Sequence, residues 1–184
     1  MLFVCQKDVS LRLCVHYRDL NCFTIPNKYL LLLIHKLLDK TRGGTWFTML
    51  YLKNSYNLMR IAAVDMWNTA FCTTQELFKY TIMPFRLTNT LVSLQEMMDT
   101  VFKDVEGCIW YLDNILIHSG NTEAVHQGIV KKVLQRCIVQ GLAGNLLKSM
   151  FHSYKTIILK HVSNSQEVKM DPSRLETMPY GLSL

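Results

Sequence analysis

The segment that decides the fold reads Ile109-Trp110-Tyr111-Leu112-Asp113-Asn114-Ile115-Leu116-Ile117. Two apolar arms flank the polar pair Asp113-Asn114, and such arms around a short polar pair are typical of a β-hairpin. The sequence therefore predicts two antiparallel strands joined by a turn at this pair. Taken alone, an Asp-Asn pair is ordinary turn chemistry.

Further helices and strands are predicted on both sides of this hairpin. Apolar residues at helical spacing predict helices over residues 30–38, 91–102 and about 121–140, and short β-like runs predict strands over 2–4, 11–15 and 46–52. Pro26 argues against a helix directly before it. In the last helix the predicted apolar face consists of Val125, Ile129, Val133, Cys137 and Ile138. Helices interspersed with hairpins indicate the α+β class.

Composition indicates one globular domain. The chain has 184 residues, is 49% hydrophobic and carries a formal charge of +6, which suits a nucleic-acid partner but is also common on a solvated surface. The longest apolar run, residues 30–34, is far shorter than the roughly 20 residues of a membrane span, and the N-terminus has no signal-peptide core. We therefore expect an intracellular protein that is neither secreted nor bound to a membrane.

The cysteines and histidines do not form a metal-binding pattern. The six cysteines include no C-x-x-C pair, so we expect free, buried thiols rather than a disulfide framework. The six histidines lack the three-to-five-residue spacing of finger-type zinc ligands. No structural metal is expected.

An ordered series of motifs runs through the chain. Residues 11–21 read LRLCVHYRDLN, residues 69–71 read TAF, residues 83–89 read MPFRLTN, residues 111–117 read YLDNILI and residues 168–172 read VKMDP. In the same order, these resemble the motifs L-R-x-C-V-D-Y-R-x-L-N, T-A-F, M-P-F-G-L-T-N, Y-L-D-D-I-L-I and V-K-M-D-P of gypsy-class LTR retrotransposon reverse transcriptases. Each motif is weak alone, but the ordered set is specific.

The resemblance implies a right-hand polymerase fold, in which an antiparallel palm sheet packs on helices. It covers residues 1–178, with the fingers at about 1–45 and mainly palm at 46–165, and leaves 179–184 as a loose tail. The polar sequence from about Ser163 already suggests a loosely held end.

The resemblance also implies a site in which carboxylates hold two divalent cations about 3.5–4 Å apart, with Mg²⁺ as the ancestral cofactor. Residues 47–56 align with the family motif F-T-x-x-D-L-R-x-G-Y, so Tyr51 replaces the first of three aspartates. Asp113 keeps the second position, and Asn114 replaces the third with a neutral amide. Asp113 is thus a remnant metal ligand, and we expect no bound cofactor.

The resemblance further implies nucleotide-binding roles for Arg12, Tyr56 and Phe85. Arg12 matches an arginine that contacts the incoming triphosphate, and Tyr56 matches an aromatic residue that screens the sugar 2′ position. Phe85 belongs to the M-P-F motif. Outside the family context, Arg12 is a surface charge and Tyr56 a core aromatic.

Four substitutions at family glycine positions suggest damage to the fold. They are Ser55, Glu76, Arg86 and Lys160. If these positions need a positive φ or a close backbone approach, each substitution costs on the order of 1 kcal/mol or more. Arg86 also introduces a charge into the apolar run 82–87. We therefore expect marginal stability and self-association.

Three functional hypotheses follow. The first is an inactive retrotransposon-derived reverse-transcriptase domain with residual, weak binding of an RNA or DNA primer-template. The second is an active RNA-directed DNA polymerase fragment, against which Tyr51 and Asn114 argue. The third is an interaction module, or a decayed open reading frame without function.

Overall fold

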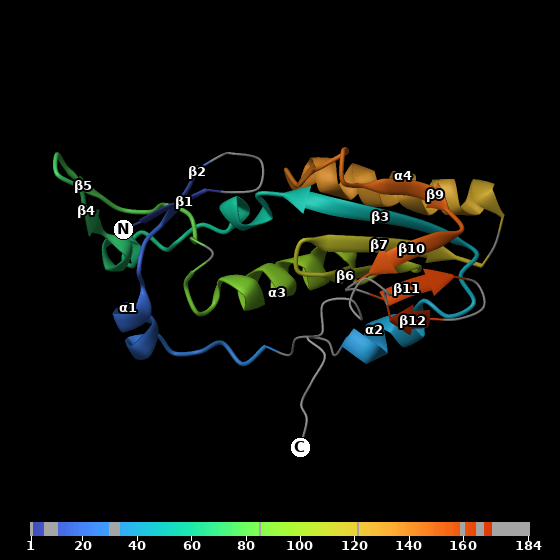
Figure 1. Ribbon diagram of the computed structural model, residues 1–184, viewed down its shortest axis with the longest axis horizontal. Helices are drawn as coiled ribbons and strands as arrows, with labels where there is room; N and C mark the ends of the chain where they lie inside the picture. Colours follow the sequence, from blue (N-terminus) through green and yellow to red (C-terminus); the bar gives the residue numbers. More distant parts are fainter. Residues whose placement is uncertain are drawn as a thin grey trace, which may run out of the picture. The chain divides into compact units, whose positions relative to one another are not determined.

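The computed structural model describes residues 2–5, 11–29, 34–84, 86–120, 122–158, 161–164 and 168–170. The chain forms two compact units that are interleaved in sequence (Figure 1). Unit 1 comprises Met1–Leu30 and Asn54–Met97, and unit 2 comprises Leu31–Lys53 and Met98–Leu184. The assignment of fingers and palm to consecutive parts of the chain stays a prediction, because compactness alone identifies neither.

Unit 1 contains short strands and helices. They are β1 (Leu2–Cys5), β2 (Leu11–Cys14), α1 (Arg18–Phe23), the 3-10 helices η1 (Ser55–Leu58) and η2 (Met66–Thr69), β4 (Phe71–Cys72) and β5 (Leu77–Phe78). β1 and β2 form the predicted antiparallel hairpin, with Leu2 opposite Cys14. Helix α1 was not predicted, because Pro26 argued against a helix before it. Proline restricts only the residue that directly precedes it, and α1 ends earlier, at Phe23.

Unit 2 is built around an antiparallel sheet of order β6-β7-β3-β8, with β9 also paired to β3. Its elements are α2 (Ile34–Lys40), β3 (Trp46–Lys53), β6 (Cys108–Tyr111), β7 (Asn114–Ser119), α4 (Glu123–Val139), β8 (Ala143–Gly144), β9 (Met150–Ser153), β10 (Lys155–Ile158), β11 (His161–Asn164) and β12 (Val168–Met170). Helix α3 (Thr90–Phe102) crosses the boundary between the units. The predicted α+β class is confirmed.

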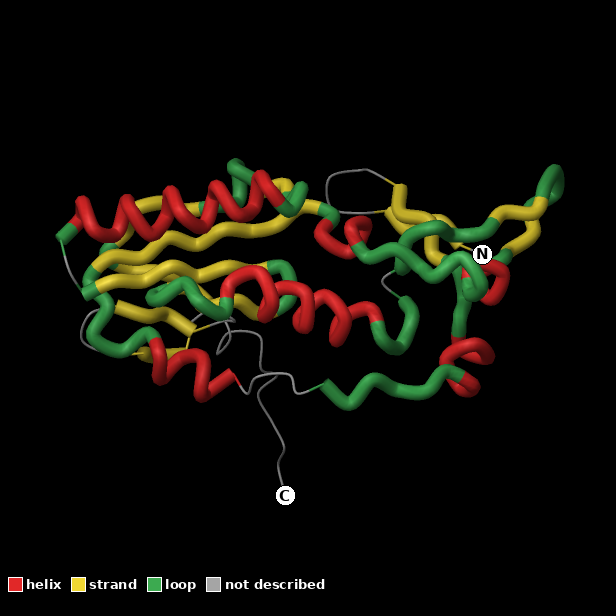
Figure 2. Tube along the Cα trace, turned by 180° about the vertical axis from the view of Figure 1, so that it is seen from behind, coloured by secondary structure: helices red, strands yellow, loops and turns green. Residues whose placement is uncertain are grey.

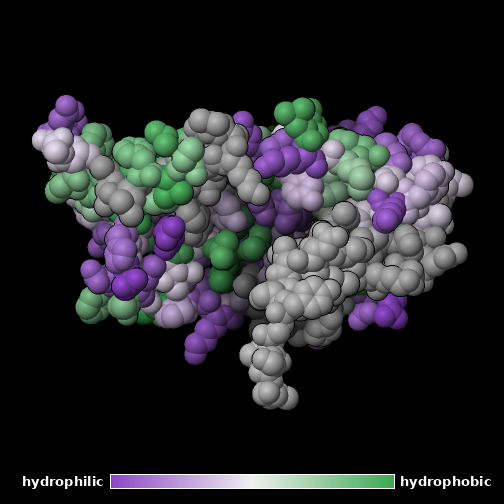
Figure 3. Space-filling model, viewed as in Figure 1, coloured by the Kyte–Doolittle hydropathy of each residue, from purple (hydrophilic) through white to green (hydrophobic). Residues whose placement is uncertain are grey.

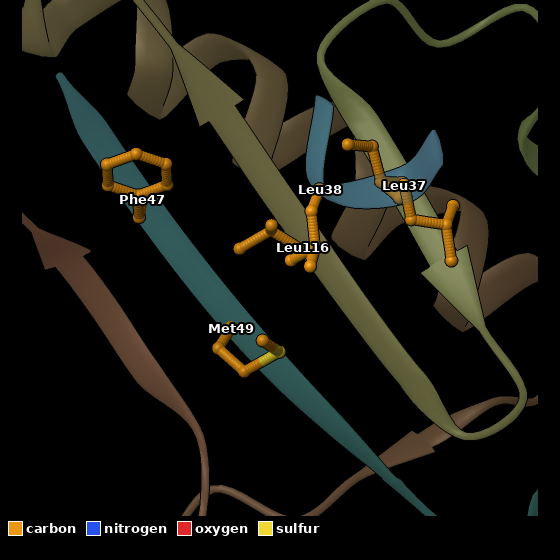
Figure 4. Close-up of a cluster of buried hydrophobic side chains, with 6 residues drawn as sticks. Leu37, Leu38, Phe47, Met49 and Leu116 are labelled. Atoms are coloured by element: carbon orange, nitrogen blue, oxygen red, sulfur yellow. The ribbon is translucent and has the colours of Figure 1, made fainter. Parts of the chain in front are cut away.

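Register divides the side chains of the central sheet between its two faces. Met49 on β3 lies opposite Leu116 on β7, which lies opposite Ile109 on β6. Because side chains alternate along a strand, this row shares a face with Phe47, and α2 covers it with Leu37 and Leu38. Figure 4 shows Leu38 of α2 beside Leu116 of β7, with Phe47 and Met49 on the neighbouring strand β3.

The opposite face of the sheet is covered by α4, which runs along the strands in Figures 1 and 2. The buried residues of α4 are His126, Val130, Val133 and Cys137. The predicted face was therefore wrong in part. Val125 is 45% exposed and Ile138 is 77% exposed, since the buried stripe follows a spacing of four, three and four residues from a histidine.

The last strands correct the expectation of a loose end from Ser163. β10, β11 and β12 form an antiparallel sheet in which Ser163 pairs with both Thr156 and Val168. Residues 171–184, including the expected tail 179–184, lie outside the described residues.

Two of the six cysteines fit the expectation of buried thiols. Cys108 and Cys137 are buried, whereas Cys5, Cys22 and Cys72 are exposed and Cys14 is half-buried. Burial raises the pKa of Cys108 to about 12 and that of Cys137 to about 11, so both stay protonated.

The expected damage at former glycine positions is only partly present. None of Ser55, Glu76 and Arg86 is among the described residues with positive φ. Glu76 and Arg86 are exposed, so the expected cost of burying the Arg86 charge was wrong. Ser55 is buried, and its hydroxyl has no partner among the described residues. Lys160 lies outside them.

Candidate active site

Three adjacent strands bring the predicted ligand positions together. Tyr51 on β3 lies directly opposite Asn114 on β7, and Asn114 lies opposite Tyr111 on β6. Directly paired residues have Cβ atoms about 4.5–5.5 Å apart. This row lies on the same face of the sheet as the core row of Met49 and Leu116. Tyr51 follows Met49 by two residues on β3, and Asn114 precedes Leu116 by two residues on β7.

Asp113 lies in the turn that joins β6 and β7. The turn consists of Leu112 and Asp113, while Asn114 is already the first residue of β7. The prediction of an Asp113-Asn114 turn was thus wrong by one residue. Leu112 adopts φ 56°, a left-handed conformation that costs an L-residue roughly 1–2 kcal/mol. The backbone N–H of Leu52 donates to the Asp113 carbonyl at 2.8 Å, which ties the turn to β3.

The other edge of β3 is held at Tyr51 by the loop between β8 and β9. The backbone N–H of Tyr51 donates to Oγ of Ser149 at 3.1 Å, and the Tyr51 carbonyl accepts from the N–H of Asn145 at 2.7 Å. Sequence reasoning missed this support, because Asn145 and Ser149 carry no motif that points to residue 51. Between them, Leu146 is 72% exposed and Leu147 is fully exposed. The corresponding loop carries the hydrophobic spheres at the upper edge of Figure 3.

The side chain of Tyr51 belongs to the core. The rings of Tyr51 and Tyr111, both half-buried, pack against the cluster that contains Met49 and Leu116. A phenol that faces apolar side chains offers no anionic oxygen. The position that the resemblance assigns to an aspartate has become an extension of the hydrophobic core.

The residues present do not fit a two-cation site. Magnesium prefers several hard, anionic oxygen ligands. The three positions that the resemblance assigns to ligands hold one carboxylate, Asp113 in the turn, and the neutral side chains of Tyr51 and Asn114. Within the described ranges, no group of three or more His, Cys, Asp or Glu side chains could hold a metal ion. The strands thus bring together the positions that the resemblance assigns to metal ligands, but Tyr51 and Asn114 are not anionic donors.

The three nucleotide-binding candidates, Arg12, Tyr56 and Phe85, belong to unit 1. Tyr56 lies half-buried in η1 of unit 1, whereas the row belongs to unit 2. Arg12 contributes its backbone to β2, but its side chain lies outside the described part of the structure, as does all of Phe85. Their nucleotide-binding roles stay predictions.

Comparison with known proteins gives one consistent family. Residues 5–170 match the family described as "Reverse transcriptase (RNA-dependent DNA polymerase)". The Transposon Tf2-7 and Tf2-3 polyproteins of Schizosaccharomyces pombe (strain 972 / ATCC 24843) are 37% and 36% identical to the chain over 166 residues. The match covers 89% of this chain but 12% of each polyprotein, so the chain spans a small part of the relatives' length.

Solved structures show the same fold at lower sequence identity. The foamy viral protease-reverse transcriptase dRH in complex with ds DNA is similar with a TM-score of 0.88 and 19% identity, over 97% of this chain and 32% of that one. The foamy viral protease-reverse transcriptase in complex with RNA/DNA hybrid gives 0.85 and 19%, over 97% and 24%. Within the described residues, no helix is long and apolar enough to cross a membrane.

Proposed function

Because the chain belongs to the reverse transcriptase (RNA-dependent DNA polymerase) family, we propose that it is a retrotransposon-derived domain that no longer polymerises and that retains weak binding of an RNA or DNA primer-template. In this proposal the fingers comprise about residues 1–45, and residues 46–165 are mainly palm. The proposed location is intracellular.

One observation carries the proposal of inactivity. Tyr51, near the end of β3, lies opposite Asn114, the first residue of β7 and the neighbour of Asp113 in sequence. The family resemblance places its metal-binding carboxylates at these three positions. In-line attack by a 3′ hydroxyl on a nucleotide requires that the developing charge be neutralised by metal ions. One carboxylate accompanied by a phenol and an amide gives little support to such a pair of metal ions.

Residual nucleic-acid binding is supported by two observations. The chain carries a formal charge of +6, which favours contact with phosphates. The foamy viral proteins of the same fold are seen with ds DNA and with an RNA/DNA hybrid. Binding would consist of phosphate contacts and would weaken steeply with salt.

The decisive experiment for activity is primer extension with the purified chain, all four nucleotides and either Mg²⁺ or Mn²⁺. We expect no product above a heat-inactivated sample of the same protein. Extension clearly above that control would reject the proposal in favour of an active polymerase fragment. A foamy viral protease-reverse transcriptase run in parallel confirms that substrate and buffer support synthesis.

Binding is tested separately, by fluorescence anisotropy of a labelled primer-template at 50, 100 and 200 mM salt. We expect weak binding that falls with increasing salt, by about tenfold or more over this range for several phosphate contacts. Absence of binding at 50 mM salt, with the protein shown to be folded by circular dichroism, would instead favour an interaction module or a chain without function.

A further inference from the structure

Two histidines are in contact where α4 packs on the sheet of unit 2. His126 of α4 is fully buried, and its Nε2 lies 2.9 Å from the hydroxyl of Thr48 on β3. The same hydroxyl accepts the backbone N–H of His152 on β9 at 3.1 Å. Thr48 therefore joins α4, β3 and β9 at one buried point.

The two imidazole rings are in contact but incompletely hydrogen-bonded. The rings of His126 and His152 meet edge to face, with centroids 5.4 Å apart. Nδ1 of each ring is buried, and neither has a hydrogen-bond partner among the described residues. A neutral His126 needs only the Thr48 contact at Nε2 and leaves one uncharged nitrogen unpaired, which is a limited cost.

A protonated His126 is much less compatible with this packing. Protonation makes both ring nitrogens donors, so a buried N–H⁺ would point to no acceptor that the described residues supply. A buried charge without a partner is far more costly than a buried neutral group. The available hydrogen-bond partners thus favour the neutral form of the His126 ring.

The titratable groups that act on His126 also favour its neutral form, with one exception. β9 contributes His152 and β3 contributes the uncharged Thr48, whereas His118 of β7, paired with Phe47, belongs to the other face of the sheet. The exception is Glu123 in the first turn of α4, which is exposed and accepts a hydrogen bond from Gln127 at 3.1 Å. Burial, followed by His152 and His118, lowers the pKa of His126, and burial also lowers the pKa of His118.

We propose that His126 is an acid-sensitive latch: its neutral ring holds α4 against β3 and β9, and its protonation releases α4 from the sheet. The latch does not depend on polymerase activity or nucleic-acid binding. It adds to the fold a conformational step controlled by mild acid.

The direction of the pH effect follows from linkage. When α4 leaves the sheet, His126 is solvated and regains an ordinary pKa near 6.5, which is higher than its pKa in the closed state. The open state therefore binds the proton more tightly. The closed state is fully favoured above about pH 6.5 and loses its advantage as the pH falls, by about tenfold per pH unit for one histidine.

The test is amide hydrogen exchange of the purified 184-residue chain at pH 7.0 and pH 5.0, corrected for the intrinsic effect of pH on exchange. We expect the opening equilibrium of the α4 amides of Val130, Val133 and Cys137 to rise severalfold, with about tenfold per pH unit as the upper limit for one histidine, while the amides of α3 keep their protection. Equal loss of protection in α3 and α4, or no loss in α4, would overturn the latch. Both outcomes are read from the wild-type chain.

Two variants assign the effect to the buried ring. His126→Gln keeps a polar side chain that cannot titrate and should remove the selective loss of α4 protection at pH 5.0. His16→Gln is the matched control, because His16 is exposed in unit 1, and it should behave as the wild type does. If a folded His126→Gln variant keeps the full pH dependence, His126 is not the latch.

Discussion

Tyr51→Asp introduces the aspartate that the family motif has at this position, but the structure predicts that it lowers the free energy of unfolding. The Tyr51 ring packs against the core cluster beside Tyr111. A fully enclosed tyrosine buries about 150–250 Å², so a half-buried ring buries on the order of 100 Å². At about 25 cal/mol per Å², losing this contact costs roughly 2.5 kcal/mol.

The new carboxylate adds a smaller penalty. It would lie on a strand, where aspartate is disfavoured by a fraction of about 1 kcal/mol, and close to Asp113 in the neighbouring turn. We expect a total loss of about 3 kcal/mol in the free energy of unfolding for Tyr51→Asp. That is a large part of the roughly 5–15 kcal/mol that stabilises a typical domain.

Urea unfolding followed by tryptophan fluorescence measures this loss. With a slope of about 2 kcal/mol per M, the unfolding midpoint should fall by about 1.5 M. Tyr51→Phe is the matched control, since it keeps the ring, and should change stability by less than about 0.5 kcal/mol. A Tyr51→Asp midpoint equal to that of the wild type would refute the conclusion that residue 51 is part of the core.

The remaining predictions concern three other sites. Ser55→Ala should raise the free energy of unfolding by about 1 kcal/mol, because it removes a buried hydroxyl without a partner among the described residues; a lower urea midpoint would show that this hydroxyl is satisfied. Arg86→Gly should change stability by less than about 0.5 kcal/mol, since Arg86 is exposed; thermal unfolding checks this, and a clear rise in the unfolding temperature would restore the idea of a damaged site. Arg136 donates to Asp104 and lowers its pKa from 3.8 to about 2, so this pair stabilises the fold above about pH 4 and loses its effect as the pH falls toward 2. Asp104→Asn should therefore show a smaller loss of stability between pH 4 and pH 2 than the wild type, in acid titrations followed by circular dichroism; identical acid profiles would contradict the pairing.

The local pattern of apolar residues was sufficient to predict those helices and strands that have one face against the core. The arms around Asp113 form the predicted hairpin, and the apolar spacing of residues 91–102 corresponds to α3, Thr90–Phe102. Periodicity identifies such elements because a strand or helix that faces a core repeats its apolar residues at a fixed interval. The order of the family motifs likewise identified the family.

Contacts between segments distant in sequence decided the burial and strand pairing of residues for which apolar periodicity gave no indication. His126 is a core residue although histidine is usually read as polar, because the Thr48 hydroxyl, far away in sequence, supplies a hydrogen-bond partner for its Nε2. Ser163 pairs within a sheet although its surroundings look like a loose end, because β11 receives backbone hydrogen bonds from both neighbours. Neither partner is visible in a local window of sequence.

The sequence by itself determined the family and the α+β class, and it shows that Tyr51 and Asn114 stand where the resemblance expects carboxylates, because these depend on residue type and order alone. Only the tertiary structure decided that Tyr51 and Asn114 face each other across β3 and β7, and that the Tyr51 ring extends the core. Strand register and burial arise from contacts between segments distant in sequence, so they are fixed only when the sheet assembles.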